Sequence, residues 1–130
     1  MRKLHAHLLY LNPAEFSNDT LIVDRAQSTA VSATTEGIDT RNEHGKLRLF
    51  DVKDSESGQT RIESLDITMI VDNSIVEIFV NKRFVLSTAV LPWYDVSKML
   101  SFFIEGPVGV EFSEVMIWEG LVDAWPARSL

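Results

Sequence analysis

The sequence predicts an all-β protein, an antiparallel two-sheet β-sandwich of the jelly-roll or concanavalin-like kind. Apolar and polar residues alternate with a period of two along several short segments, as in strands with one face toward a core. Turn-forming residues separate these segments about every 8 to 12 residues. No segment sustains the 3.6-residue period of an amphipathic helix.

The clearest strands lie within residues 64–91. Apolar residues occupy every second position of 65–71 and 76–80, and a third apolar run follows residue 83. Asp72-Asn73-Ser74 and Asn81-Lys82-Arg83 separate the runs with residues that tolerate positive φ or hydrogen-bond their own backbone. This pattern predicts a three-stranded meander.

The remaining strands are expected at residues 4–11, 20–26, 29–34, 46–52, 99–105 and 108–119, with a short helical turn at 96–99. In the 46–52 segment, Leu47 and Leu49 are expected to face inward. The alternation changes phase after Phe112, which predicts a β-bulge at Ser113-Glu114. The residues expected in the core include Met69, Met99, Met116, Phe50, Phe102 and Phe112.

Composition limits the function classes. The 130 residues are expected to form one domain, 1–130, that buries about two-thirds of the surface of its unfolded chain. The absence of cysteine excludes disulfides and thiolate metal sites. A net charge of −7 argues against nucleic acid and anionic membranes as partners and favours a neutral sugar or another protein.

No cofactor is expected, because the chain has no G-x-G-x-x-G, P-loop or H-E-x-x-H motif. No apolar run approaches the roughly 20 residues of a membrane helix. The start, MRKLHAHLLYLNP, is interpreted as a strand and not as a signal peptide, which leaves the compartment open. His5 and His7 share a strand face, but no third ligand has a supporting spacing, so no metal site is expected.

Several segments resemble one enzyme family. The hairpin VDNSIVEIFVN at 71–81 is similar to that in the C-terminal β-sandwich of glycoside hydrolase family 32, the invertases, inulinases and fructan-active enzymes. The pieces LIVDR (21–25), FIEG (103–106), WEGL (118–121) and AWP (124–126) resemble fungal members in the same order. The resemblance covers roughly residues 8–130.

The resemblance implies that catalysis belongs elsewhere. In this family an N-terminal five-bladed propeller supplies a nucleophile and a general acid from N-D-P-N-G, R-D-P and E-C segments. Here residues 12–15 lack the Asp, residues 24–26 reverse the R-D order, and cysteine is absent. The expectation is therefore a non-catalytic accessory domain of a β-fructofuranosidase-like hydrolase, stabilising or packing on its propeller, with no catalytic residue of its own.

Two alternatives stay open: a free-standing, lectin-like carbohydrate-binding module and a protein that dimerises through a sheet edge. Family members have further strands before the segment that matches 4–11. The chain is therefore either truncated or closes its sandwich without its first strands. An unpaired edge favours pairing with another chain. The expected partners are thus a family 32 propeller or a homodimer, with fructose-containing glycans as the sugar class.

The candidate contact residues are Trp93, Tyr94 and Asp95, in a turn after Pro92. The aromatic rings of Trp93 and Tyr94 suit stacking on a sugar or packing against a neighbouring domain. Glu77 lies in the middle of a strand and either faces solvent or meets a partner surface.

Asn18 begins an N-x-T sequon, which matters if the full-length parent is secreted, as the family resemblance suggests. The remaining acidic residues of interest, Asp24, Asp72 and Glu105, are expected to cap turns or to pair at the surface with Arg25, Lys82 or Arg83.

Overall fold

The computed structural model describes residues 2–10, 20–26, 28–29, 37–91, 101–102 and 110–120. These residues contain nine β-strands and no helix. Every strand pair is antiparallel. The predicted all-β, antiparallel fold is therefore confirmed. None of the described residues forms a helix long and apolar enough to cross a membrane.

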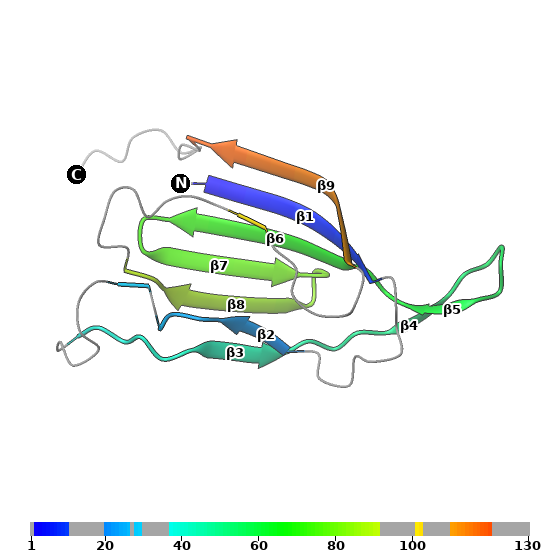
Figure 1. Ribbon diagram of the computed structural model, residues 1–130, viewed down its shortest axis with the longest axis horizontal. Helices are drawn as coiled ribbons and strands as arrows, with labels where there is room; N and C mark the ends of the chain where they lie inside the picture. The colour runs from blue at the N-terminus through cyan, green and yellow to red at the C-terminus, as the bar shows by residue number, and fades with distance from the viewer. Residues whose placement is uncertain are drawn as a thin grey trace, which may run out of the picture.

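The larger sheet has five strands in the order β8-β7-β6-β1-β9 (Figure 1). Its strands are β1 (Arg2–Tyr10), β6 (Leu65–Asp72), β7 (Ile75–Val80), β8 (Phe84–Ala89) and β9 (Val110–Glu119). Strands β6, β7 and β8 are the predicted meander. Strand β1 lies between β6 and β9, so the sheet brings the first and last described strands side by side.

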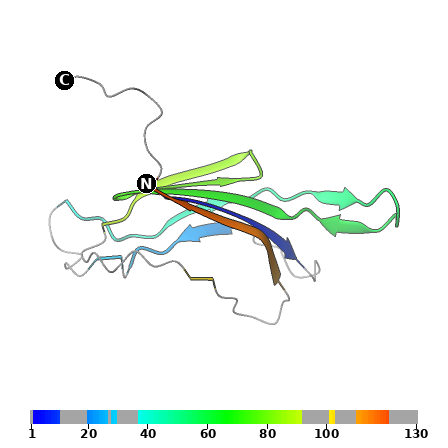
Figure 2. The ribbon, with the colours of Figure 1, turned by 90° about the horizontal axis from the view of Figure 1, so that it is seen from above.

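Two smaller pairs complete the described structure. Strands β2 (Thr20–Val23) and β3 (Glu43–Lys46) pair with each other and lie on one side of the larger sheet (Figure 2). Strands β4 (Asp51–Lys53) and β5 (Thr60–Ile62) form a hairpin that projects from the body (Figure 1). The side chain of Asp54 accepts hydrogen bonds from the backbone N–H groups of Glu56 (2.8 Å) and Ser57 (2.9 Å) in its turn. These bonds stabilise the carboxylate and lower the pKa of Asp54.

The core lies between the inner face of the meander and the smaller β2–β3 layer. Its buried members are Leu65, Ile78 and Val80. Partly buried side chains around them come from both layers: Leu21, Val23, Leu47, Leu49, Ile67, Met69, Val76 and Phe84. The inward orientation predicted for the two leucines of the 46–52 segment is confirmed.

Gly45 allows β3 to approach the larger sheet closely. A Cβ atom at this position would lie 2.7 Å from two ring atoms of Phe84. Real Cβ atoms do not come this close to a ring held in a core. The phenyl ring of Phe84 on β8 therefore occupies the space that the side chain of any residue other than glycine would need at position 45.

The reversals of the meander use the residues that the sequence indicated. Asn73, Asn81 and Lys82 all have positive φ, at 50°, 50° and 56°. Consecutive positive φ values at Asn81 and Lys82 match the right-handed twist of the flanking strands. The side chain of Asn81 also accepts a hydrogen bond from Asp66 N–H (2.7 Å) and donates one to Ser64 O (3.1 Å).

The predicted bulge in the last strand is confirmed. On β1, His5 pairs with Met116 and His7 pairs with Ser113, so β9 carries one extra residue between these pairs. Glu114 has φ of 52° at this point. The bulge changes which residues of β9 face the core, as the phase change indicated.

Other expectations were wrong. Residues 46–52 do not form one strand, because β3 ends at Lys46 and β4 begins at Asp51. Phe50, Phe102 and Met116 are 42%, 42% and 46% exposed and do not belong to the core. Alternation shows which side a residue points to, but it does not show whether a second layer covers that side.

Phe102 packs against the half-buried Phe112 of β9, with ring centroids 5.3 Å apart. Residues 101–102 are not in a strand, and the rest of the expected 99–105 strand lies outside the described residues. Residues 30–34 and 96–99 also lie outside them.

The core predicts a matched pair of outcomes on one strand. Ile78→Ala should lower the free energy of unfolding by about 2–5 kcal/mol, because Ile78 is 5% exposed and its removal leaves a cavity. Ile75→Ala, at a position 54% exposed on the same strand, should change it by less than about 0.5 kcal/mol. Urea unfolding of the chain measures both. Equal losses would contradict the assignment of the core face.

Candidate functional site

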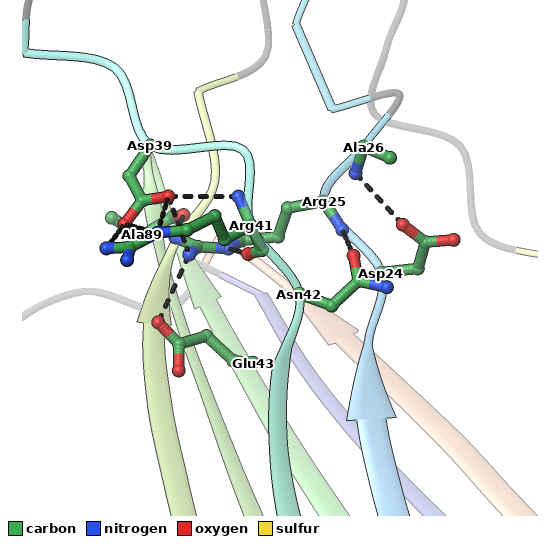
Figure 3. A network of polar contacts seen from close by, with 8 residues as sticks. All are labelled: Asp24, Arg25, Ala26, Asp39, Arg41, Asn42, Glu43 and Ala89. Atoms are coloured by element: carbon green, nitrogen blue, oxygen red, sulfur yellow. Dashed lines mark hydrogen bonds and ion pairs between the residues drawn. The ribbon is translucent and has the colours of Figure 1, made fainter. Parts of the chain in front are cut away.

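A buried guanidinium organises the best-defined cluster of polar groups (Figure 3). Arg25 follows β2 and is 4% exposed. Its Nε donates to Arg41 O (2.7 Å), its Nη1 to Ala89 O (3.1 Å) and its Nη2 to Glu43 Oε1 (3.1 Å). Since Ala89 ends β8 and Glu43 begins β3, one side chain joins the two layers.

The loop beside Arg25 is shaped by further hydrogen bonds. Arg25 N–H donates to Asn42 Oδ1 (3.2 Å), and Asp24 Oδ1 accepts from Ala26 N–H (2.9 Å). Asp24 therefore caps a turn, as predicted. The exposed Arg41 makes a bidentate contact with Asp39, with Nη2–Oδ2 at 2.7 Å and Nε–Oδ1 at 3.0 Å.

Two carboxylates meet at Arg25. The Nη2 atom of Arg25 lies 3.6 Å from Asp39 Oδ1 and 3.1 Å from Glu43 Oε1. Hydrogen bonds from Arg41, with added attraction from both guanidiniums, hold the pKa of Asp39 far below its usual range. A general acid needs the opposite, a carboxyl that keeps its proton near neutral pH. The geometry is that of a structural ion-pair network.

The sequence did not reveal the burial of Arg25, which was expected to pair at the surface. The available signal was weak: Arg25 follows an apolar strand directly, and an acidic and polar run, 39–43, comes later in the chain. Nothing in this spacing shows that the run folds back over the end of β2.

Most of the predicted site residues belong to segments that the structure does not describe. Trp93, Tyr94, Asp95 and Asn18 lie outside the described residues, as does Glu105. The roles assigned to them stay predictions.

Glu77 lies half-buried on β7, opposite Ile70 of β6 and Ser87 of β8. Its face of the sheet also carries the exposed Ile75 and Val85. Contact between Glu77 and a partner stays a prediction. Within the described part of the chain, no group of three or more His, Asp or Glu residues is arranged to hold a metal ion.

Because Arg25 links the two layers, removal of its side chain should greatly lower the stability of the fold. Arg25→Met leaves the carbonyls of Arg41 and Ala89 without their donor, and we expect a loss of about 2–4 kcal/mol in the free energy of unfolding. Arg41→Met is the matched control, because its side chain is 87% exposed. It should cost far less. Equal losses for Arg25→Met and Arg41→Met in urea unfolding would show that the hydrogen bonds of Arg25 do not hold the two layers together.

Asp39 predicts a dependence of stability on pH. A carboxyl whose pKa is lowered by folding stabilises the fold above its unfolded pKa of about 4 and loses this contribution as the pH falls. Asp39→Asn should therefore show a shallower decline in the free energy of unfolding between about pH 5 and pH 2.5. Asp51→Asn, an exposed position on the projecting hairpin, is the control. Identical slopes for both variants would contradict the assignment.

Comparison with known proteins places these features in a family. The family model of the glycosyl hydrolases family 32 C terminal matches residues 9–119. Among curated proteins, none shows a significant match to this chain.

Solved structures agree with the family model. A β-fructofuranosidase from Aspergillus kawachii, solved with glycerol, is 42% identical with a TM-score of 0.83, and the match covers 99% of this chain and 25% of that one. A fructosyltransferase from A. japonicus is 40% identical with a TM-score of 0.85, covering 98% and 24%. The chain thus spans about a quarter of the length of these relatives. Its β-sandwich matches their C-terminal domain, and the chain belongs to the C-terminal domain family of the family 32 glycosyl hydrolases.

Proposed function

We propose that these 130 residues act as one non-catalytic β-sandwich domain, which packs on the catalytic propeller of a β-fructofuranosidase-like enzyme and stabilises it. One observation carries the proposal: the family model for the C-terminal domain spans residues 9–119, while the chain covers only a quarter of its relatives. The parent would then hydrolyse or transfer fructosyl groups, as the names of the relatives indicate.

The two carboxylates that meet at Arg25 support the absence of a catalytic role. A glycosidase of the usual kind needs two carboxyl groups facing one sugar, one of them protonated near neutral pH. Asp39 and Glu43 instead share the guanidinium of Arg25, and the pKa of Asp39 is lowered. The N-D-P-N-G, R-D-P and E-C segments are also absent from the sequence.

The outer face of the larger sheet is the proposed contact with the propeller. The register of β7, β8 and β9 places Ile75, Val85, Met116 and Trp118 on this face, opposite the core face. Their exposed fractions run from 38% to 60%. Ile75 and Val85 lie on the adjacent strands β7 and β8, and exposed apolar side chains so placed are typical of an interaction surface. Polypeptide ahead of Arg2 would leave the sheet beside the β6–β7 turn, at an end of this same sheet.

The edge of β9 favours a second candidate function, strand pairing with another chain. On β9, residues 114–119 are exposed, and β9 is an outermost strand of the described larger sheet. Such an edge pairs readily with a strand of a second copy. Sedimentation velocity distinguishes the two: a dimer at micromolar concentration supports this candidate, and a monomer contradicts it. Glycan binding through Trp93 and Tyr94 stays a prediction.

The accessory role predicts inactivity of the chain alone. Purified chain should release no glucose or fructose from sucrose or inulin. Transcript sequencing upstream of Met1 should find an in-frame propeller with the three acidic segments, and the longer product should be active. Hydrolysis by the 130 residues alone would overturn the proposal, as would the absence of any propeller-coding sequence.

If the outer face contacts the propeller, a charge placed on it should affect the longer product and not the isolated chain. Val85→Glu should leave the thermal unfolding of the isolated chain within about 1–2 °C, because its side chain is 60% exposed. In the longer product it should lower the unfolding temperature, since a charge would be buried against the propeller. Lys53→Glu, an exposed position on the projecting hairpin, is the control and should affect neither. An unchanged longer product would exclude this face.

A further inference from the structure

A second feature, away from Arg25, lies between the chain segment that leads from β3 to β4 and the β7–β8 turn. These two segments enclose a pocket of about 280 Å³. Lys46, Arg48 and Phe50 line it from the first segment, and Asn81, Arg83 and Phe84 line it from the second.

The pocket is basic, although the chain is acidic. The net charge is −7, yet three of the twelve Lys and Arg residues line this pocket: Lys46, Arg48 and Arg83. No Asp or Glu is among the described residues that line the pocket. Its local charge is therefore opposite to that of the chain as a whole, and it favours an anionic occupant.

Glu63 holds one wall of the pocket in place without neutralising it. Its carboxylate accepts a hydrogen bond from Phe50 N–H (2.9 Å) and pairs with the guanidinium of Arg83. Arg83 also donates to Arg48 O (3.3 Å), and its guanidinium lies 4.7 Å from the centroid of the Phe50 ring. Among the described residues, Glu63 thus pairs with Arg83 and not with Arg48 or Lys46.

Arg48 is the available donor. Its guanidinium lies 5.4 Å from the centroid of the Phe50 ring, which restricts its side-chain rotamers. Among the described residues, neither this guanidinium nor the ammonium of Lys46 has a hydrogen-bonding or ion-pair partner. A guanidinium in contact with an aromatic face keeps its in-plane N–H groups free for a bidentate acceptor.

We propose that this pocket binds a carboxylate carried on a short carbon stem. Arg48 and Lys46 would donate to the carboxylate oxygens, while the rings of Phe50 and Phe84 contact the stem. The rings favour a carboxylate on carbon over inorganic phosphate, which has no apolar part. The volume lies just below the roughly 300–1,000 Å³ of pockets for larger ligands, so it suits a small organic acid or one acidic side chain of another protein segment. The site is independent of the proposed accessory role.

The test is an NMR titration of the ¹⁵N-labelled chain at constant ionic strength, with glutarate as the probe. We expect saturable shifts confined to residues 46–50 and 81–84, with a Kd of about 1–10 mM. Arg48→Gln should weaken binding about tenfold through loss of a charge-assisted hydrogen bond. Arg61→Gln, an exposed position on β5 that does not line the pocket, should stay within about twofold of the unchanged chain.

Lys46→Gln provides a second variant that should also weaken binding, should Arg48→Gln disturb the dispersion of the spectrum. Shifts that do not saturate by about 50 mM would overturn the proposal, as would equal affinities for the Arg48 and Arg61 variants. Inorganic phosphate binding as tightly as glutarate would overturn the preference for carboxylate.

A further arm separates the two sources of the carboxylate. Blocked Ala-Glu-Ala peptide is compared with blocked Ala-Gln-Ala peptide and with glutarate. Tighter binding of the glutamate peptide than of glutarate supports a protein side chain as the occupant. Tighter binding of glutarate supports a small acid.

Discussion

The two layers of this domain depend on one buried positive charge. The guanidinium of Arg25 is removed from water, which is costly unless its N–H groups find acceptors. The carbonyls of Arg41 and Ala89 and the carboxylate of Glu43 supply these acceptors. Only a small set of apolar side chains is fully buried in the described residues. These hydrogen bonds hold residues 41–43 against Arg25 at the end of β2.

Local chemistry explains why the meander could be predicted. Every second residue of β6 and β7 is apolar, and its turns carry Asn73 and Asn81, residues that tolerate positive φ. The bulge at Glu114 was predictable for the same reason, since the phase of the alternation changes within a few residues. Each of these features needs only neighbours in the sequence.

The features that were not predicted need distant partners. Arg25 reaches Ala89, 64 residues away, and Arg83 reaches the carbonyl of Arg48, 35 residues away. Phe50 belongs to a segment of alternating apolar residues, yet its ring contacts the guanidiniums of Arg48 and Arg83 and is not part of the core. The spacing of residues in the sequence does not indicate these long-range contacts. Neither the ion-pair network nor the basic pocket was therefore among the expected sites.

The order of the larger sheet has a consequence for synthesis of the protein. Strand β1, the first of the described strands to be made, pairs with β6 on one side and with β9 on the other. The meander can close as soon as it leaves the ribosome, because its partners are adjacent in sequence. The first strand must instead wait until residues 110–119 have emerged before its second neighbour exists. During that interval one edge of β1 is unpaired in the nascent chain, and a chaperone is well placed to cover it.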